Sequence, residues 1–323
     1  MVVETIEEGI VTMIELFKKT EIDFVGKRFV FFVISGLAVL VGVVAMIQIA
    51  RGPSGGANLG VDFTGGTSLS LKFNKPVRME EARHILATGG LADAELQAVV
   101  AEQKLLVRIK KEGGGKMDTR VSNLFFKALP ENPFVVESST EIGPKIGQKL
   151  QKDAGLAIIL STLGIILYIA FRFEFRFGVA AMAATFHDVL VILGIFYLLD
   201  KEITLLFITA LLTIAGYSLS DTVVVFDRIR ENLRTKKREL LPTVINRSIN
   251  EVLARTFNTS FTTLLAVGTL FFFGGEVIHD FAFVMVLGVL VGTYSSWFIA
   301  SPLLIVLKDV MPSRNEAPVF KKA

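Results

Sequence analysis

One acidic residue lies inside an otherwise apolar stretch, and its position guides the interpretation of the whole chain. Asp221 is flanked by apolar and small hydroxyl residues over positions 216–226. An ionised carboxylate is costly in hydrocarbon, so an acid in a membrane span usually serves proton relay, ion coordination or ion pairing. We hypothesise that Asp221 couples a proton or another ion to function. The alternative is a buried acid that only fixes the packing of two helices.

The helix that must carry Asp221 has a polar stripe beside it. Its members lie at positions i, i+4, i+7 and i+11, which share one helical face: Thr209, Thr213, Gly216 and Ser220. Small residues on such a face allow a second helix to approach closely. We therefore expect the carboxylate to point into a helix bundle and not into lipid, where it could be protonated reversibly.

A basic residue opens the next apolar stretch. Arg255 shares a helical face with Thr259, Thr262 and Thr263. An arginine at the cytoplasmic end of a span is often a snorkelling anchor. Near Asp221 it is also a candidate ion-pair partner, and protonation of the acid would then break the pair and give a two-state switch. Both interpretations remain open.

Two further positions carry groups that can titrate. His187 and Asp188 lie together near the middle of another apolar stretch, where histidine is suited to proton relay and where a hydrogen bond that fixes packing is an equal alternative. Asp227 is different, because it lies beside Arg228 and Arg230 at the end of its apolar stretch. It is predicted to form an ion pair at the membrane edge.

The composition indicates an integral membrane protein. Hydrophobic residues make up 52% of the 323 residues and occur in blocks long enough to span a bilayer. The chain has no cysteine, which excludes disulfides, thiolate metal sites and thiol nucleophiles. No enzyme motif, metal-site motif or nucleic-acid-binding pattern is recognised. We therefore predict a non-enzymatic protein without a cofactor, in which either a proton or another ion could be the coupling ion.

The predicted fold class is a polytopic α-helical membrane protein with six transmembrane helices and one periplasmic α+β domain. The expected spans are 29–50, 153–171, 177–199, 203–226, 256–273 and 281–307. Lys and Arg concentrate in the segments that flank them on one side, which places both termini in the cytoplasm. The remaining regions are an N-terminal segment (1–28), the periplasmic domain (51–152), a cytoplasmic loop (227–255) and a cytoplasmic tail (308–323).

The periplasmic region is predicted to fold on its own. Strand-like alternation and amphipathic helical spacing follow one another in the order β-α-β-β-α-β, which is typical of a ferredoxin-like sandwich. The glycine-containing stretch 58–67 that leads into the first strand is predicted to be a tight structural turn and not a phosphate-binding nest. Residues 4–26 are predicted to form an interfacial amphipathic helix.

Several stretches together resemble the SecF branch of the SecD–SecF family, within the resistance-nodulation-division (RND) superfamily. They follow the family order along nearly the whole chain: residues 23–28, 60–67, 143–147, 187–188, 216–231 and 255–260. The glycine-pair motif is shared with SecD, but a SecD chain would carry a much larger outer domain. The resemblance implies half of an RND-type bundle in the bacterial inner membrane.

The resemblance also implies a function. Family members pair with SecD and use the proton motive force to draw secreted proteins through the SecYEG translocon late in export, after the ATP-driven step. By position, Asp221 matches the family's essential intramembrane acid, Arg255 matches the basic residue on the next helix, and a second acid is expected from SecD. YajC and YidC are further expected neighbours, and the unfolded preprotein is the expected substrate. The alternatives are an RND-type exporter subunit for a small solute or lipid, and a non-transporting translocon scaffold.

Overall fold

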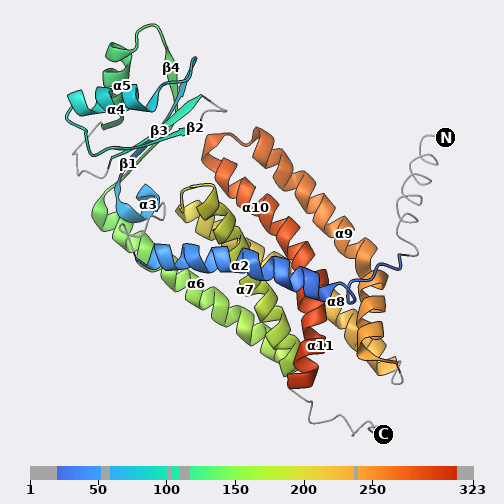
Figure 1. Ribbon diagram of the computed structural model, residues 1–323. Coiled ribbons are helices and arrows are strands. Elements are labelled where there is room, and N and C mark those ends of the chain that lie inside the picture. The colour runs from blue at the N-terminus through green and yellow to red at the C-terminus, as the bar shows by residue number, and fades with distance from the viewer. Residues whose placement is uncertain (1–19, 52–58, 100–102, 110–116, 236–238, 311–323) are drawn as a thin grey trace, which may run out of the picture.

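The protein, described here from a computed structural model over residues 20–51, 59–99, 103–109, 117–235 and 239–310, consists of a helical bundle and a small α+β domain (Figure 1). Six helical spans in these residues are long and apolar enough to cross a membrane, as predicted. They are α2 (Arg28–Ala50), α6 (Pro144–Arg172), α7 (Phe175–Leu198), α8 (Leu205–Thr235), α9 (Leu241–Phe273) and a sixth built of α10 (Glu276–Ser295), η3 (Ser296–Ala300) and α11 (Ser301–Val310).

Three of these helices extend furthest beyond the apolar windows that predicted them. α6 begins at Pro144, α8 continues to Thr235 and α9 begins at Leu241. A hydropathy window detects only the part of a helix that suits hydrocarbon, whereas the backbone hydrogen bonds continue into water. Proline in the first turn of α6 and of α9 explains where these two helices start, because that position needs no backbone N–H donor.

The sixth span changes its winding in its second half. η3 is a π-helical turn between α10 and α11. The Ser301 hydroxyl donates to the Ser296 carbonyl oxygen at 2.8 Å and so helps to satisfy the widened turn. Because π turns inside α-helices often mark functional positions, this feature draws attention to its neighbours on α8.

The periplasmic domain has the predicted element order. It contains β1 (Gly66–Phe73), α4 (Met79–Thr88), β2 (Glu95–Val99), β3 (Lys104–Ile109), α5 (Met117–Ala128) and β4 (Phe134–Ile142). The strands form one antiparallel sheet in the order β2-β3-β1-β4. The connections are those of a ferredoxin-like sandwich.

Strand alternation gives the sheet two different faces. Leu69, Leu71 and Phe73 of β1 are buried with α4 and α5 in a closed hydrophobic core. Ser68, Ser70 and the neighbouring hydroxyl residues of β4 lie on the opposite, polar face. Successive side chains of a strand point to opposite sides. The polar face lines one cavity together with Glu202 and Thr204, so it is turned toward the helical bundle.

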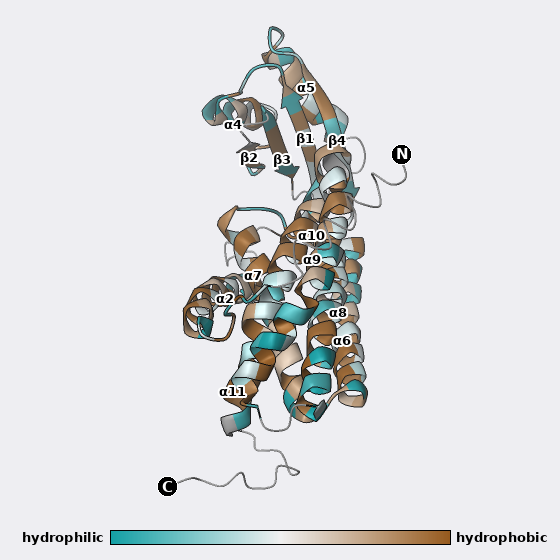
Figure 2. Ribbon diagram, turned by 90° about the vertical axis from the view of Figure 1, so that its right-hand side faces the viewer, coloured by the Kyte–Doolittle hydropathy of each residue, from teal (hydrophilic) through white to brown (hydrophobic). Residues whose placement is uncertain are grey.

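The bundle has a buried centre and an exposed periphery. In the apolar windows of α7, α8 and the sixth span, 61%, 50% and 50% of residues are buried, against 17% or less for α2, α6 and α9. The surfaces of these outer helices are largely hydrophobic (Figure 2). The chain therefore buries α7, α8 and α10 by itself and leaves the other helices facing lipid or a partner.

The helix predicted over residues 4–26 is wrong at its C-terminal end, and residues 1–19 lie outside the described part of the chain. The residues from Thr20 to Lys27 contain no α-helix. Their backbone groups are bound by side-chain amides of α9 instead: Ile22 N donates to Asn250 Oδ1 at 3.0 Å and Phe24 N donates to Asn246 Oδ1 at 2.8 Å. The Phe24 ring is fully buried against the bundle, which fixes this segment as an anchor.

Candidate functional site

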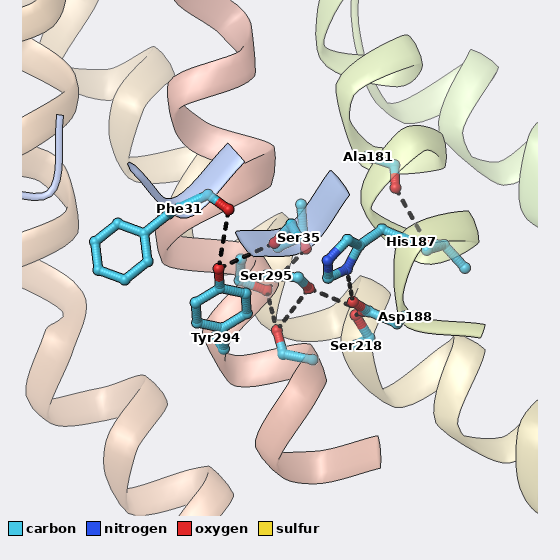
Figure 3. Close-up of polar contacts among 12 residues, drawn as sticks. Phe31, Ser35, Ala181, His187, Asp188, Ser218, Tyr294 and Ser295 are labelled. Carbon is cyan, nitrogen blue, oxygen red and sulfur yellow. Dashed lines mark hydrogen bonds and ion pairs between the residues drawn. The ribbon is translucent and has the colours of Figure 1, made fainter. Parts of the chain in front are cut away.

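The first of two buried acids lies where α7, α8 and α10 meet. Asp188 of α7 is completely buried (Figure 3). Its Oδ2 atom accepts hydrogen bonds from the Ser218 hydroxyl of α8 and, at 2.9 Å, from the Ser295 hydroxyl of α10. Its Oδ1 atom lies 2.8 Å from His187 Nδ1. Both carboxylate oxygens are thus bound within this chain, which makes Asp188 a closed site.

His187 connects this site to the N-terminal span. Its ring is buried, and among the described residues its Nε2 atom has no hydrogen-bond partner. The ring lies 6.3 Å from that of Tyr294, whose hydroxyl is 3.0 Å from the Ser35 hydroxyl of α2 (Figure 3). The His187–Asp188 pair is therefore enclosed by four helices, which suits either of its two predicted roles.

A glycine on α10 allows the close approach that forms this site. A Cβ atom at Gly292 would lie 2.9 Å from Ser218 Cβ, closer than side chains tolerate. Small residues at such crossings let two helices come into direct contact within a membrane. Gly292 therefore brings α8 close enough to α10 for Ser218 and Ser295 to reach the same carboxylate.

The second buried acid is Asp221 on α8. It is only 4% exposed, and its Oδ2 atom accepts a hydrogen bond of 3.2 Å from the Ser260 hydroxyl of α9. Ser260 also lies 2.6 Å from the Thr293 hydroxyl of α10 and within reach of the Tyr217 hydroxyl. Asp221 thus has a short hydroxyl network on one side and no cationic partner among the described residues.

The two acids are linked through one helix. Ser218 and Asp221 are three residues apart on α8 and so lie on neighbouring turns of one face. The next residue, Thr222, lies 2.9 Å from the Ser296 hydroxyl in the π turn. A rotation or shift of α8 would consequently alter the surroundings of both carboxylates together.

Beside Asp221 the polar stripe faces outward. Thr209, Thr213, Gly216 and Ser220 are all exposed on α8, and exposed polar residues of α9 lie near them in the bundle: Asn258, Thr259 and Thr262. The threonine hydroxyls donate to carbonyl oxygens of their own helices, for example Thr213 to Thr209 at 2.8 Å. Hydrogen bonding is thus locally satisfied, but the face is more polar than a lipid contact requires.

Of the two ion pairs considered from the sequence, the structure contains one. Arg255 is exposed on α9 and makes no ion pair with Asp221 among the described residues. The predicted pairing of these two residues is therefore not present within this chain. The ion pair predicted for Asp227 is present: its carboxylate binds Arg172 and lies 3.9 Å from Arg230. No group of three His, Cys, Asp or Glu residues in these described stretches could hold a metal ion.

Sequence reasoning missed the hydroxyl groups that bind the acids. Ser260, Ser295 and Thr293 come from helices far along the chain from their partners. The available signal was weak, since each lies among other hydroxyl residues, such as Thr259 and Ser296, and the sequence does not show which of them faces an acid. Hydroxyl side chains are tolerated anywhere in such helices because they can donate to their own backbone.

Two protein families match regions of this chain. The family described as "Protein export membrane protein SecD/SecF, C-terminal" matches residues 124–310, and the "SecD/SecF GG Motif" matches residues 54–77. The chain is 53% identical over 297 residues to a protein translocase subunit SecF of Thermodesulfovibrio yellowstonii, covering 91% of this chain and 97% of that protein. It is 40% identical to SecF of Endomicrobium trichonymphae, covering 89% and 92%.

Solved structures agree with the sequence comparisons. The crystal structure of SecDF from Thermus thermophilus, described as a translocon-associated membrane protein, matches with a TM-score of 0.78 and 36% identity over 89% of this chain. The match covers 39% of that longer chain. A SecDF structure in a super-membrane-facing form matches with a TM-score of 0.63 at the same identity and covers 90% of this chain and 39% of that chain. With a family match over more than half of its length and close relatives along almost all of it, this chain belongs to the SecF family of SecD/SecF protein-export membrane proteins.

Proposed function

We propose that this chain is the SecF-type half of a proton-driven unit that assists protein export through the Sec translocon of the bacterial inner membrane. The observation that carries the proposal is Asp221, a nearly buried acid at the margin of an exposed polar face inside the membrane span. Ionisable residues at such positions characteristically mark ion and proton pathways. Protons are the coupling ion, and no other cofactor is required.

The exposed polar stripe is the docking face for a second bundle supplied by SecD. Its residues are small or carry short hydroxyl groups, which suits close contact between helices. The solved SecDF chain is longer than this one, because the match covers only 39% of it. Docking of a SecD bundle on α8 and α9 would enclose Asp221 between the two halves.

Arg255 is then directed to the partner rather than to Asp221 alone. It is exposed on α9, and hydrocarbon is an unfavourable environment for its charge. An acid contributed by SecD at this interface would compensate the charge of Arg255. Protonation of that acid and of Asp221 would then break the ion pair. This provides the two-state element that a coupled machine needs.

The energetics are adequate for a conformational cycle. Moving one elementary charge through a potential of about 100 mV gains ~2.3 kcal/mol. A bias of this size changes the ratio of two states by roughly 50-fold. One proton for each cycle could therefore shift the periplasmic domain between two positions, pulling the unfolded preprotein away from SecYEG without ATP. YajC and YidC are candidate neighbours in the same assembly.

Exchange of Asp221 tests this function. Asp221→Asn keeps the size of the side chain but cannot be protonated and deprotonated. We expect the variant to assemble with SecD and to lose the gradient-dependent completion of export in membrane vesicles after ATP is exhausted. Asp227→Asn is the matched control, because Asp227 lies at the membrane edge in ion pairs and should leave this phase of export intact.

The same experiment discriminates the alternatives. A non-transporting scaffold would tolerate Asp221→Asn, so normal late export with the variant would overturn proton coupling. A solute or lipid exporter would need an apolar pocket in its outer domain, whereas the domain core described above is closed and β4 pairs only with β1 among the described strands. A free strand edge is better suited to an extended polypeptide.

The proposed orientation places both termini in the cytoplasm and the sheet in the periplasm. The natural absence of cysteine makes the chain suitable for single-cysteine labelling. An impermeant thiol reagent added to intact spheroplasts should label cysteine at the exposed Asn123 and spare cysteine at the exposed Arg234. The reverse pattern would invert the topology.

A further inference from the structure

The segment between the first span and the sheet contacts the helix that carries Asp221. It runs from Leu59 through the short helix α3 (Val61–Thr64) to Gly66, where β1 begins. It lies within the region matched by the SecD/SecF GG motif. Figure 1 shows α3 between the sheet and the periplasmic ends of the helices. None of the groups described above around the two acids comes from this segment, so its role is unassigned.

Asp62 caps α8 from outside that helix. The Leu205 N–H, the first of α8, donates to Asp62 Oδ2 at 2.7 Å across a separation of 143 residues. Thr204 accepts from Phe207 N–H at 3.2 Å as a local cap. The first N–H groups of a helix have no partner within it, and an acidic side chain there also interacts favourably with the helix dipole. Asp62 therefore holds the first turn of α8.

The same segment is bound to the loop that precedes α8. Gly60 N donates to the Ile203 carbonyl oxygen at 2.9 Å, and Leu59 forms a parallel bridge with Ile203. A Cβ atom at Gly60 would lie 3.1 Å from Thr204 Cγ2, so the two backbones approach closely because residue 60 is glycine. The segment and the start of α8 are therefore one connected unit.

The other end of the segment is fixed to α6 and to the sheet. Gly65 has a φ of 71°, in the left-handed region, and a Cβ atom there would lie 2.9 Å from Pro144 Cα at the start of α6. Gly66 follows with a φ of 122° and begins β1. β1 is a central strand of the sheet, paired with both β3 and β4. The glycine pair thus turns the chain from the cap of α8 directly into the sheet.

The sheet makes a second contact with the loop before α8. The buried Arg108 of β3 forms an ion pair with Glu202, and Gln97 Nε2 of β2 donates to the Asp200 carbonyl oxygen at 2.9 Å. Between sheet and bundle lies a cavity of about 280 Å³, lined in part by hydroxyl residues of the sheet: Ser68, Ser70, Ser138 and Thr140. The sheet is therefore joined to the start of α8 at localised contacts around a cavity and not by continuous packing.

We propose that the GG-motif segment is the joint through which movement of α8 reaches the periplasmic sheet, with Asp62 as the positioning residue that holds α8 to it. The inference rests on the proposed function, in which protonation of Asp221 moves α8. Leu205 and Asp221 belong to one continuous helix, and they lie ~24 Å apart along its axis at a rise of about 1.5 Å per residue. A shift at Asp221 is thus carried to the capped end and on to β1.

The test compares cap-competent and cap-incompetent residues at position 62. Spin labels on cysteines at the exposed Arg83 of α4 and the exposed Phe273 of α9 report the distance between sheet and bundle in the complete SecD-paired complex in proteoliposomes. Asp221→Asn imitates the neutral acid and should shift this distance distribution. Asp62→Ala should reduce the shift to less than half. Asp62→Asn and Asp62→Ser should retain most of it, because Asn and Ser also cap helices well.

Asp118→Ala is the matched control, since Asp118 accepts a backbone hydrogen bond from Thr119 within the periplasmic domain and should leave the shift unchanged. An undiminished shift in Asp62→Ala overturns the joint and leaves proton coupling in place. No shift with Asp62 intact overturns the proposed coupling and the joint together. If Asp62→Ala does not assemble, Gly60→Ala replaces it, because its added Cβ would press on Thr204, and a full shift in that variant counts against the joint.

Discussion

The surroundings of Asp188 and Asp221 differ although both are aspartates buried in neighbouring helices. Asp188 receives hydrogen bonds from two serines and has His187 beside it, all within this chain. Asp221 receives one from Ser260 and borders an exposed polar face. The comparison teaches that burial alone does not define a functional acid. The closed site is complete without a partner, whereas the open site has a side that only another bundle can fill.

The largest expected effect is a difference in unfolding free energy between variants of the two acids. Asp188→Ala removes the acceptor of Ser218, Ser295 and His187, of which Ser295 keeps the Gly292 carbonyl oxygen, and we expect the unfolding free energy to fall by roughly 1–3 kcal/mol. Asp221→Ala should cost less than about 1 kcal/mol, because Ser260 keeps Thr293 as a partner. Unfolding of both variants in detergent measures these two changes in free energy. Equal destabilisation by both changes would contradict the division into closed and open sites.

The next effect concerns Arg255 on the open side. Arg255→Ala should impair export nearly as much as Asp221→Asn, and Arg255→Lys should be partly tolerated because lysine keeps the charge without the planar fork. Combined with Asp221→Asn, Arg255→Ala should add less than its separate effect, with a coupling of at least about 0.5 kcal/mol. Export rates of the unchanged protein, the variants Asp221→Asn and Arg255→Ala, and the double variant form a double-mutant cycle. If the effects of the two changes on export were strictly additive, Arg255 would be only an anchor at the membrane edge.

A smaller effect is expected from Ser260, whose hydroxyl donates to Asp221. Ser260→Ala removes that donor, and a membrane hydrogen bond of ~0.6 kcal/mol corresponds to roughly a threefold change in export rate. Ser260→Thr keeps a hydroxyl and serves as the control. If Ser260→Ala abolished export as completely as Asp221→Asn, the open site would depend on its hydroxyl network and not chiefly on its acid.

The smallest effect comes from a third acid, Glu202, which unlike the other two has a full cationic partner. Burial raises the pKa of Glu202 above its ordinary value, Arg108 opposes this rise, and Asp280 and Asp62 add to it. We call the sheet docked when Arg108 contacts Glu202 in the loop before α8. The docked state therefore binds the carboxyl proton of Glu202 more tightly than a state in which the sheet has moved away and Glu202 is hydrated.

The sign of the pH effect follows from that raised pKa. This contribution to docking is fully present below the ordinary glutamate pKa and is lost as pH rises through the raised value. The fraction of docked sheet, measured by the spin-label pair described above, should fall modestly as pH rises across that window. Glu202→Gln should remove the dependence, and a slope of opposite sign would show that the ion pair with Arg108 dominates over burial.

Much of the architecture was predictable because it depends on local patterns. The six spans follow from apolar blocks, and the β-α-β-β-α-β order follows from alternation such as that of Leu69, Leu71 and Phe73. Helical spacing alone predicted that the stripe on α8 shares one face, whereas its exposure in this chain was not predicted. The predicted N-terminal helix failed where asparagines of α9 bind the backbone of residues 22 and 24, a contact that no local pattern signals.

By itself, the sequence determined that Asp221 would be an acid in a membrane span, because the cost of charge in hydrocarbon depends only on its apolar neighbours in the chain. It also indicated His187, Asp188 and Arg255 as groups of interest. Only the tertiary structure decided that Asp188 is closed, that Arg255 does not contact Asp221, and that Asp62 caps α8. These are contacts between residues distant in sequence, and they depend on the distances of closest approach between helices, which glycines such as Gly292 set through packing.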